Sequence, residues 1–99
     1  MKIPKKFKLF GTTYNVLWDN KKMNNTTRYG ESDYSTTEIT LSDTHGVNPL
    51  SEDRIMDTFY HERTHAILDS MHKRDLSADE EFVDVFSKLL RQSIETAEY

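Results

Sequence analysis

Residues 59 to 65, with the sequence FYHERTH, carry the side chains best suited to chemistry in this chain. His61 and His65 are four positions apart, and residues four apart lie one turn from each other on the same face of an α-helix. Both imidazoles can therefore bind one metal ion, at the distance of about 2.0–2.1 Å that zinc sites show. Glu62 lies about 100° further round the helix, where it is poorly placed as a ligand but can accept a proton from an activated water. The spacing predicts a zinc site with two histidine ligands and Glu62 as general base.

A third ligand is expected from the segment DEEFVD, residues 79 to 84. Glu80 lies at the margin of the apolar face of a second expected helix, whereas Glu81 points further towards solvent. We predict that Glu80 is the third ligand and that Asp84, one turn later, accepts the second ring N–H of a ligating histidine. Two alternatives remain open. Glu80 also fits a capping box with Ser77, and Asp84 also fits an ordinary solvated helix charge.

A pair of surface histidines without a metal is the alternative for His61 and His65. On a helical wheel, the apolar residues of this helix form one broad arc, and both histidines fall outside it. Leu68 lies beside them, and a pair facing solvent would leave that leucine exposed. We therefore expect the histidines to face a cleft that another element covers.

The first half of the chain has the alternating pattern of short strands. Apolar and polar residues alternate most clearly near residues 6–9, 14–18 and 37–42. The polar segment 19–27 predicts a mobile loop.

The second half of the chain has helical spacing. Ser51 is expected to cap a helix that ends near Met71 or His72, and Ser77 is expected to cap a second long helix. Strands followed by two long helices predict the α+β class, with a short, antiparallel-rich N-terminal sheet of about three to four strands. Residues 1–99 are expected to form a single metal-binding domain.

The composition limits the classes of function. The chain has 99 residues, a net charge of −4 and no cysteine, so thiolate ligands and disulfides are excluded. No basic cluster is large enough to bind a nucleic-acid backbone, and no segment approaches membrane-spanning or signal-peptide length. We therefore expect neither a nucleic-acid nor a membrane partner, and a cytoplasmic location, in the host cytoplasm if the protein is viral.

The combination of HERTH and DEEFVD resembles the zincin metallopeptidases of the glutamate-ligand type. Residue by residue, His61 and His65 match the histidine ligands of that family and Glu62 matches its catalytic base. Glu80 matches its glutamate ligand, and Asp84 matches the aspartate that supports the ligands.

The resemblance covers roughly residues 36 to 94, and order and size are similar to the minimal zincins, which include small phage-encoded proteins and ImmA/IrrE-type peptidase domains. Val83 stands where the family often has a small residue, which is a mild departure. In such proteins a short sheet precedes the active-site helix. The resemblance implies that a protein or peptide substrate binds along the strand at Thr37 to Ser42.

A residue that would stabilise the transition state is not identified by the sequence. His72 and Tyr60 are candidates for contacts with the transition state or the substrate, and His45 and Tyr34 are further ones. The leading hypothesis is a zinc-dependent hydrolase, specifically a small metallopeptidase. The alternatives are a catalytically silent, zinc-stabilised module that engages a host or partner protein, and a metal-free domain with incidental histidines.

Overall fold

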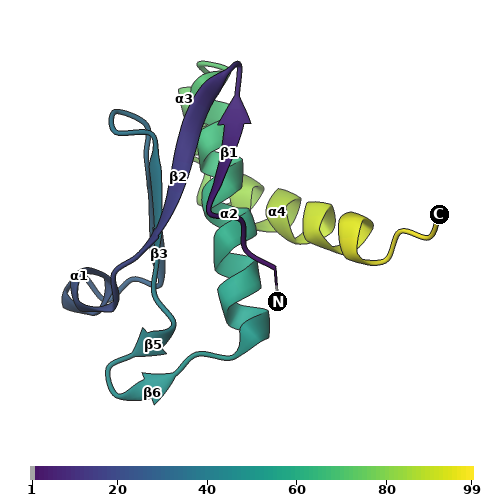
Figure 1. Cartoon of the computed structure of the whole chain (residues 1–99). Coiled ribbons are helices and arrows are strands. Elements are labelled where there is room, and N and C mark those ends of the chain that lie inside the picture. Colours follow the sequence, from purple (N-terminus) through teal and green to yellow (C-terminus); the bar gives the residue numbers. More distant parts are fainter. Residues whose placement is uncertain (1) are drawn as a thin grey trace.

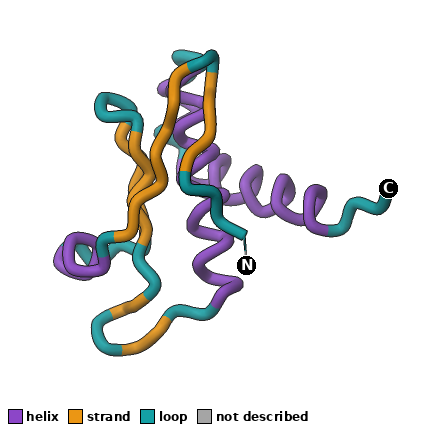
Figure 2. The backbone as a smooth tube through the Cα atoms, in the orientation of Figure 1, coloured by secondary structure: helices purple, strands orange, loops and turns teal. Residues whose placement is uncertain are grey.

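A computed structural model describes residues 2–99, and its first half forms a four-stranded sheet (Figures 1 and 2). The strands are β1 Lys6–Leu9, β2 Thr12–Trp18, β3 Gly30–Asp33 and β4 Glu38–Leu41. They lie in the order β1-β2-β4-β3, with β2 and β4 parallel and the two outer pairs antiparallel. The sheet is therefore mixed.

The other elements are a short helix and a two-stranded hairpin in the first half of the chain and three helices in the second half. They are α1 Asn20–Asn25, the hairpin of β5 Thr44–His45 and β6 Asn48–Pro49, α2 Glu52–Ser70, α3 Arg74–Ser77 and α4 Glu80–Glu95. The sheet lies on one side of α2, and α4 extends from the other side (Figure 1). The predicted α+β class is confirmed. Within residues 2–99, no helix combines the length and the apolar character needed to cross a membrane.

The predicted strand at residues 37–42 corresponds to β4, but β4 is not an edge of the sheet. It pairs with β2 on one side and with β3 on the other, so its backbone hydrogen bonds are already used. The expectation that a peptide pairs along Thr37 to Ser42 therefore needs correction. The outer strand on this side is β3, which has one free edge.

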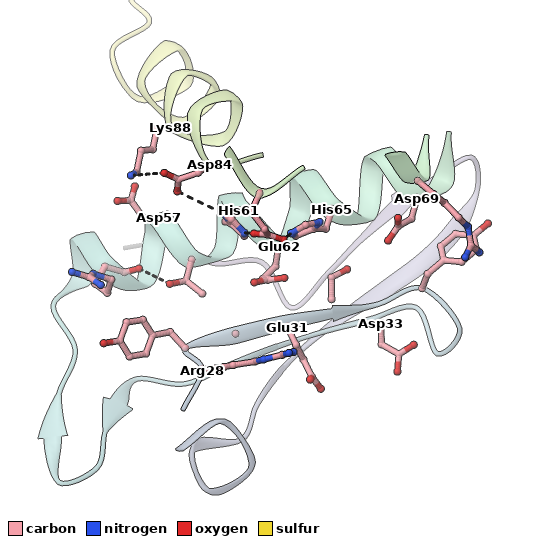
Figure 3. A pocket seen from close by; sticks show the side chains of 18 of the residues that line it. Arg28, Glu31, Asp33, Asp57, His61, Glu62, His65, Asp69, Asp84 and Lys88 are labelled. Atoms are coloured by element: carbon pink, nitrogen blue, oxygen red, sulfur yellow. Dashed lines mark hydrogen bonds and ion pairs between the residues drawn. The ribbon is translucent and has the colours of Figure 1, made fainter. Parts of the chain in front are cut away.

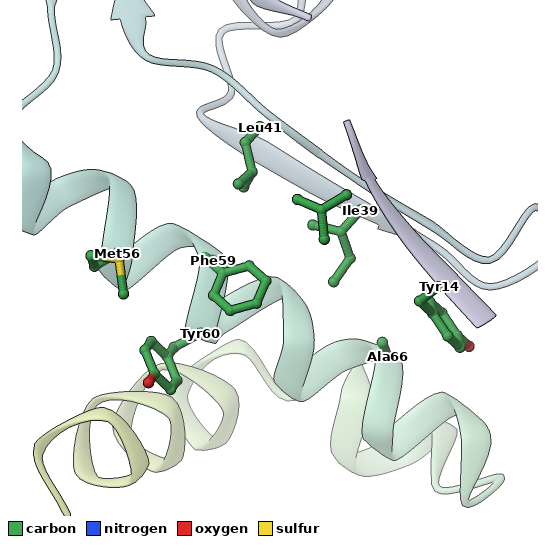
Figure 4. Packing of buried hydrophobic residues seen from close by; sticks show 8 residues of the cluster. Tyr14, Ile39, Leu41, Met56, Phe59, Tyr60 and Ala66 are labelled. Carbon is green, nitrogen blue, oxygen red and sulfur yellow. The ribbon is translucent and has the colours of Figure 1, made fainter. Parts of the chain in front are cut away.

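The core lies between the sheet and α2 (Figure 4). Tyr14, Ile39 and Leu41 of the sheet are at most 1% exposed, and Phe59 and Ala66 of α2 are at most 2% exposed. Burying one large apolar side chain contributes about 1.5–3 kcal/mol, so this face fixes how α2 is rotated against the sheet. The histidine-bearing edge of α2 is held outside the apolar contact.

Helix α2 begins where the sequence predicts. The Oγ atom of Ser51 accepts a hydrogen bond from the backbone N–H of Arg54 at 3.1 Å, and Glu52 and Asp53 occupy the first turn, where the helix dipole favours acids. The helix ends at Ser70, and His72 takes a left-handed backbone conformation with φ of 58° just beyond it.

The predicted mobile loop at residues 19–27 is wrong, because it contains the short helix α1. Asp19 caps this helix by accepting a hydrogen bond from the N–H of Lys22 at 3.0 Å, and Met23 is fully buried. One apolar residue in a polar segment gives little periodicity, so the sequence pattern did not reveal the helix.

Helix α4 uses only part of its apolar face against α2. Val83 and Ser87 are buried, whereas Phe86 is 45% exposed and Leu89 is 61% exposed. The sequence predicts an apolar face for this helix, and the structure leaves much of that face open.

Arg91 joins the outer part of α4 to the beginning of α2. Its Nη1 atom lies 2.7 Å from Asp57 Oδ1, its Nη2 atom lies 2.9 Å from Asp53 Oδ1, and its Nε atom donates to Glu95 at 2.9 Å. A guanidinium can serve several carboxylates at once because its five N–H groups point in fixed directions. These contacts help to set the angle at which α4 leaves α2.

Gly30 permits the close approach of β3 to α2. A Cβ atom at this position would lie 2.7 Å from the Cγ2 atom of Thr58 and 3.2 Å from both a side-chain carbon of Leu41 and the backbone oxygen of Thr40. Any side chain here would push the strand away from the helix. Gly30 therefore sets the separation of the two elements that enclose the site.

We predict that Gly30→Ala lowers the free energy of unfolding by about 1–3 kcal/mol, the usual cost of overpacking. Thr58→Ser removes the methyl group that the new Cβ would meet, while retaining the hydroxyl that donates to the Arg54 carbonyl. In denaturant unfolding, the double variant should therefore be more stable than the sum of the single effects implies. Strictly additive effects would contradict this account of Gly30.

Candidate metal site

Three potential ligands meet where α4 begins beside the middle of α2. The Nε2 atoms of His61 and His65 each lie 3.1 Å from a different carboxylate oxygen of Glu80 (Figure 3). One ligand atom from each residue lies within 4.8 Å of the other two. The spacing of four on α2 puts both imidazoles on one side of that helix, and the first turn of α4 supplies the carboxylate. The structure thus has a His-His-Glu group that could hold a metal ion.

The predicted cap at Ser77 is wrong. Helix α4 begins at Glu80, and its N-cap is Asp79, whose side chain accepts a hydrogen bond from the N–H of Phe82 at 3.1 Å. Asp and Ser are both good capping residues, so the sequence alone did not choose between the two positions. The carboxylate of Glu80 is consequently turned to the histidines instead of the backbone of Ser77.

Ser77 has a different position, which the sequence did not suggest. It ends α3, it is buried, and its Oγ atom lies 3.0 Å from Nδ1 of His65. This hydroxyl can accept the ring N–H at Nδ1, which leaves the lone pair on Nε2 free to bind a metal. Ser77 therefore supports the orientation of His65.

Asp84 lies beside the other histidine. Its Oδ1 atom is 3.8 Å from Nδ1 of His61, which is too far for a hydrogen bond but close enough for an ion pair with a protonated ring. Its Oδ2 atom is 3.1 Å from Nζ of Lys88, one turn further along α4. The two non-ligating ring nitrogens thus face Ser77 and Asp84.

Burial and nearby charge act strongly on Glu62. Burial, which is the largest cause, and the negative charge of Glu80 together raise the pKa of its carboxyl to about 7. The positive charge of Arg28 opposes this rise. Burial also lowers the pKa of His65 below its ordinary value of 6.5. A neutral imidazole is the form that binds metal, so this shift favours the ligand state near neutral pH.

The group opens into a cavity of about 1020 Å³. Residues of α2 form one wall and β3, with the segment before it, forms the opposite wall (Figure 3). Residues from α3 and α4 line the remainder. Glu62 and the His-His-Glu group thus line the same cavity.

Ser32 lines the wall formed by β3, and no sequence motif marks it. Its hydroxyl is buried and has no hydrogen-bond partner among residues 2–99. Side chains alternate along a strand, so Ser32 shares the face of Gly30, which meets α2 at Thr58. Ser32 lines the cavity, as Glu62 does.

Of the other residues selected from the sequence, only Tyr34 is among the lining residues of this cavity in the described chain. Tyr60 is buried in the core cluster, and the ring of His72 packs edge-on against Tyr34. Tyr34 does line the cavity, whereas Tyr60, His72 and His45 are not among its lining residues in the described chain. Glu81 is exposed and is likewise absent from the lining.

The fold and the site together define an α+β protein with a His-His-Glu group whose geometry resembles that of HExxH proteins with a distant glutamate. Comparisons with models of protein families, with curated proteins and with solved structures found no significant match to this chain. The likeness to zincins therefore rests on the residues and their arrangement.

We predict that Ser77→Ala weakens zinc binding by about 10- to 100-fold, the usual effect of removing a hydrogen bond to a ligating histidine. Zinc affinity is measured by competition with a chromophoric chelator. Ser87→Ala is the matched control, because Ser87 is also buried but its hydroxyl donates to a carbonyl of its own helix. The His61→Ala/His65→Ala variant gives the background zinc binding of a protein that lacks the two histidine ligands. Equal affinity in Ser77→Ala and wild type would show that the hydroxyl does not support His65.

We predict that Glu62 stabilises the chelated, metal-free protein at low pH and that this contribution is lost as the pH rises from about 4.5 to about 7. The folded-state pKa of Glu62, about 7, exceeds its ordinary value of 4.5, so the folded state binds the proton more tightly than the unfolded chain. The contribution amounts to at most about 3 kcal/mol.

Glu62→Gln should remove this contribution, and the measurement is the difference in unfolding free energy between variant and wild type across that pH range. The lowered pKa of His65 acts in the opposite sense in both proteins, so the difference isolates Glu62. A difference that does not change with pH would contradict the raised pKa.

Proposed function

We propose that this protein is a zinc-dependent hydrolase that cleaves peptide bonds. The observation that carries the proposal is the convergence of His61, His65 and Glu80 beside the partly buried Glu62, all open to one cavity. Two imidazoles and one carboxylate are the ligand set of many catalytic zinc sites, which keep a further position open. A structural zinc site is usually closed by a fourth protein ligand, and no fourth His, Asp or Glu joins this group within residues 2–99.

A zinc ion held by these three residues would polarise a carbonyl group and make a water acidic enough to ionise near neutral pH. Glu62 takes the proton of the attacking water and returns it to the leaving amine. In the metal-free chain the pKa of this carboxyl is about 7. A zinc ion beside it would lower that pKa and favour the carboxylate form, which accepts the proton.

The walls of the cavity suit an extended chain. The free edge of β3 offers unpaired backbone N–H and C=O groups, to which a peptide can add as a further strand. The backbone of a peptide in this position would run past Glu62. We therefore place the peptide on β3, in place of the strand at residues 37–42.

A second candidate function is a zinc-stabilised binding module that engages a partner protein without turnover. The observation that favours it is the exposed apolar face of α4, where Phe86 and Leu89 have no covering element among the described residues. Exposed apolar patches often mark protein interfaces. In this case Glu62 would not be needed for the biological effect.

We predict that Glu62→Gln lowers the rate of peptide cleavage by at least about 100-fold, the usual contribution of a general base, while zinc stays bound. Cleavage of a synthetic peptide mixture is followed by mass spectrometry, and bound zinc is measured in the same samples. Glu81→Gln is the matched control, because it is the same substitution on an exposed side chain outside the cavity.

Undiminished cleavage by Glu62→Gln would exclude the mechanism. Absence of cleavage by the zinc-loaded wild type, with stability that depends on zinc, would favour the binding module. If neither the stability nor the zinc content changes when zinc or chelator is added, the protein is a metal-free domain.

A further inference from the structure

Arg28 is a cation on the wall of the cavity opposite the ligand group. It lies just before β3 and lines the cavity, and its guanidinium lies on the strand side, across from Glu62 (Figure 3). Its charge is close enough to oppose the rise in the pKa of Glu62. A chain bound along β3 would therefore pass Arg28 next to the reacting bond.

The side chain of Arg28 makes no hydrogen bond or ion pair with any residue in the described part of the chain. Within the described residues, the hydrogen bond that Arg28 makes is through its backbone N–H, which donates to the carbonyl of Met23 at 2.9 Å. A guanidinium presents five N–H donors, and here all of them are available to a ligand.

Most acidic residues of the same cavity are already engaged, which matters because they outnumber the cations. Those engaged by cations or by backbone are Glu31 with Lys22, Asp53 and Asp57 with Arg91, Asp84 with Lys88, and Asp33 with the turn at Ser35 and Thr36. Glu80 faces the histidines. Because these carboxylates already have partners, they attract a basic ligand less strongly than the same number of free carboxylates would.

The remaining charges without an ion pair lie in three places, and one of them is the first turn of α2, where Arg54 packs over the ring of Tyr29. Asp69 and Arg74 both line the part of the cavity near α3, where their opposite charges offset each other at longer range. Beside Glu62, the unpaired cation is Arg28. Arg28 is therefore a cation that an incoming chain meets beside Glu62 and that no carboxylate of the described residues pairs with.

We propose that Arg28 selects substrates with an acidic group close to the scissile bond. The inference rests on the proposed peptidase function. A guanidinium can bind a carboxylate through two parallel N–H···O hydrogen bonds, which gives both energy and directional selectivity. The carboxylate belongs either to a Glu or Asp side chain or to the C-terminus of a short peptide, and these sources are separable by experiment.

The test uses the zinc-loaded full chain and synthetic peptides in matched pairs. Members of a pair differ only at one position within three residues of the cleaved bond, where Glu is compared with Gln or with Lys, or in a free against an amidated C-terminus. Cleavage rates are compared for wild type, Arg28→Ala, Arg28→Glu and Lys21→Ala. Lys21→Ala is the control, because it removes the same charge from the exposed surface of α1, outside the cavity lining.

We expect wild type and Lys21→Ala to prefer the acidic member of a pair by about tenfold, the effect of one charged hydrogen-bonded contact. Arg28→Ala should lose this preference, and Arg28→Glu should favour peptides with Lys at the same position. Preference for Glu over Gln identifies a side-chain carboxylate, and preference for the free C-terminus identifies a terminal one.

Two results would overturn the assignment. One is an acidic preference that is absent in wild type or unchanged in Arg28→Ala. The other is a shift of the pH profile in Arg28→Ala that is equal for all peptides, which would mean that Arg28 only adjusts the pKa of Glu62.

If the wild type cleaves none of the peptides, the proposed hydrolase fails while Arg28 is still tested by binding. Fluorescence anisotropy then compares labelled Glu and Gln peptides on the zinc-loaded wild type, Arg28→Ala and Lys21→Ala. A preference for Glu that only Arg28→Ala loses would support acidic recognition by Arg28, and equal binding of both peptides would exclude it.

Discussion

The contact of one carboxylate with two imidazoles determines how the second half of this protein is arranged. Glu80 reaches both His61 and His65 only if the first turn of α4 lies beside the middle of α2. The short helix α3 reverses the chain between them, and Asp79 starts α4 at the position that releases Glu80 from capping. Ser77, placed by the same reversal, then supports His65 from its other ring nitrogen. The reversal of the chain between α2 and α4 therefore also determines the geometry of the potential ligands.

The opposite wall depends on a second constraint, the close contact of β3 with α2 at Gly30. Steric contact sets the distance between strand and helix, while the charges on both sides decide what the space between them accepts. The apolar core of Tyr14, Ile39, Leu41, Phe59 and Ala66 lies along a different face of α2. One helix thus serves the core with one face and the cavity with another, which explains why its histidines lie outside the apolar arc.

The sequence predicted the features that rest on short-range periodicity. The spacing of His61 and His65, the cap at Ser51 and the change from strands to helices all depend on neighbours within a few positions. Ser77 and Asp79 are equally good caps, so their choice depended on packing against α2, which a local pattern does not contain. The sheet order depended on the parallel pairing of β2 with β4, and it placed β3 instead of β4 at the edge. Arg28 and Ser32 belong to the site only through that topology, and no motif marks them.

The open face of α4 has a consequence for how the protein behaves in concentrated solution. Phe82 and Phe86 stack with ring centroids 5.7 Å apart, and Leu89 continues this apolar strip along the helix. At neutral pH the net charge of −4 keeps copies of the chain apart by mutual repulsion. That repulsion vanishes near the isoelectric point of about 5.5, where adhesion between such strips is no longer opposed. The colloidal stability of this molecule is therefore lowest in mildly acidic buffer and is set by α4, the element that also supplies Glu80.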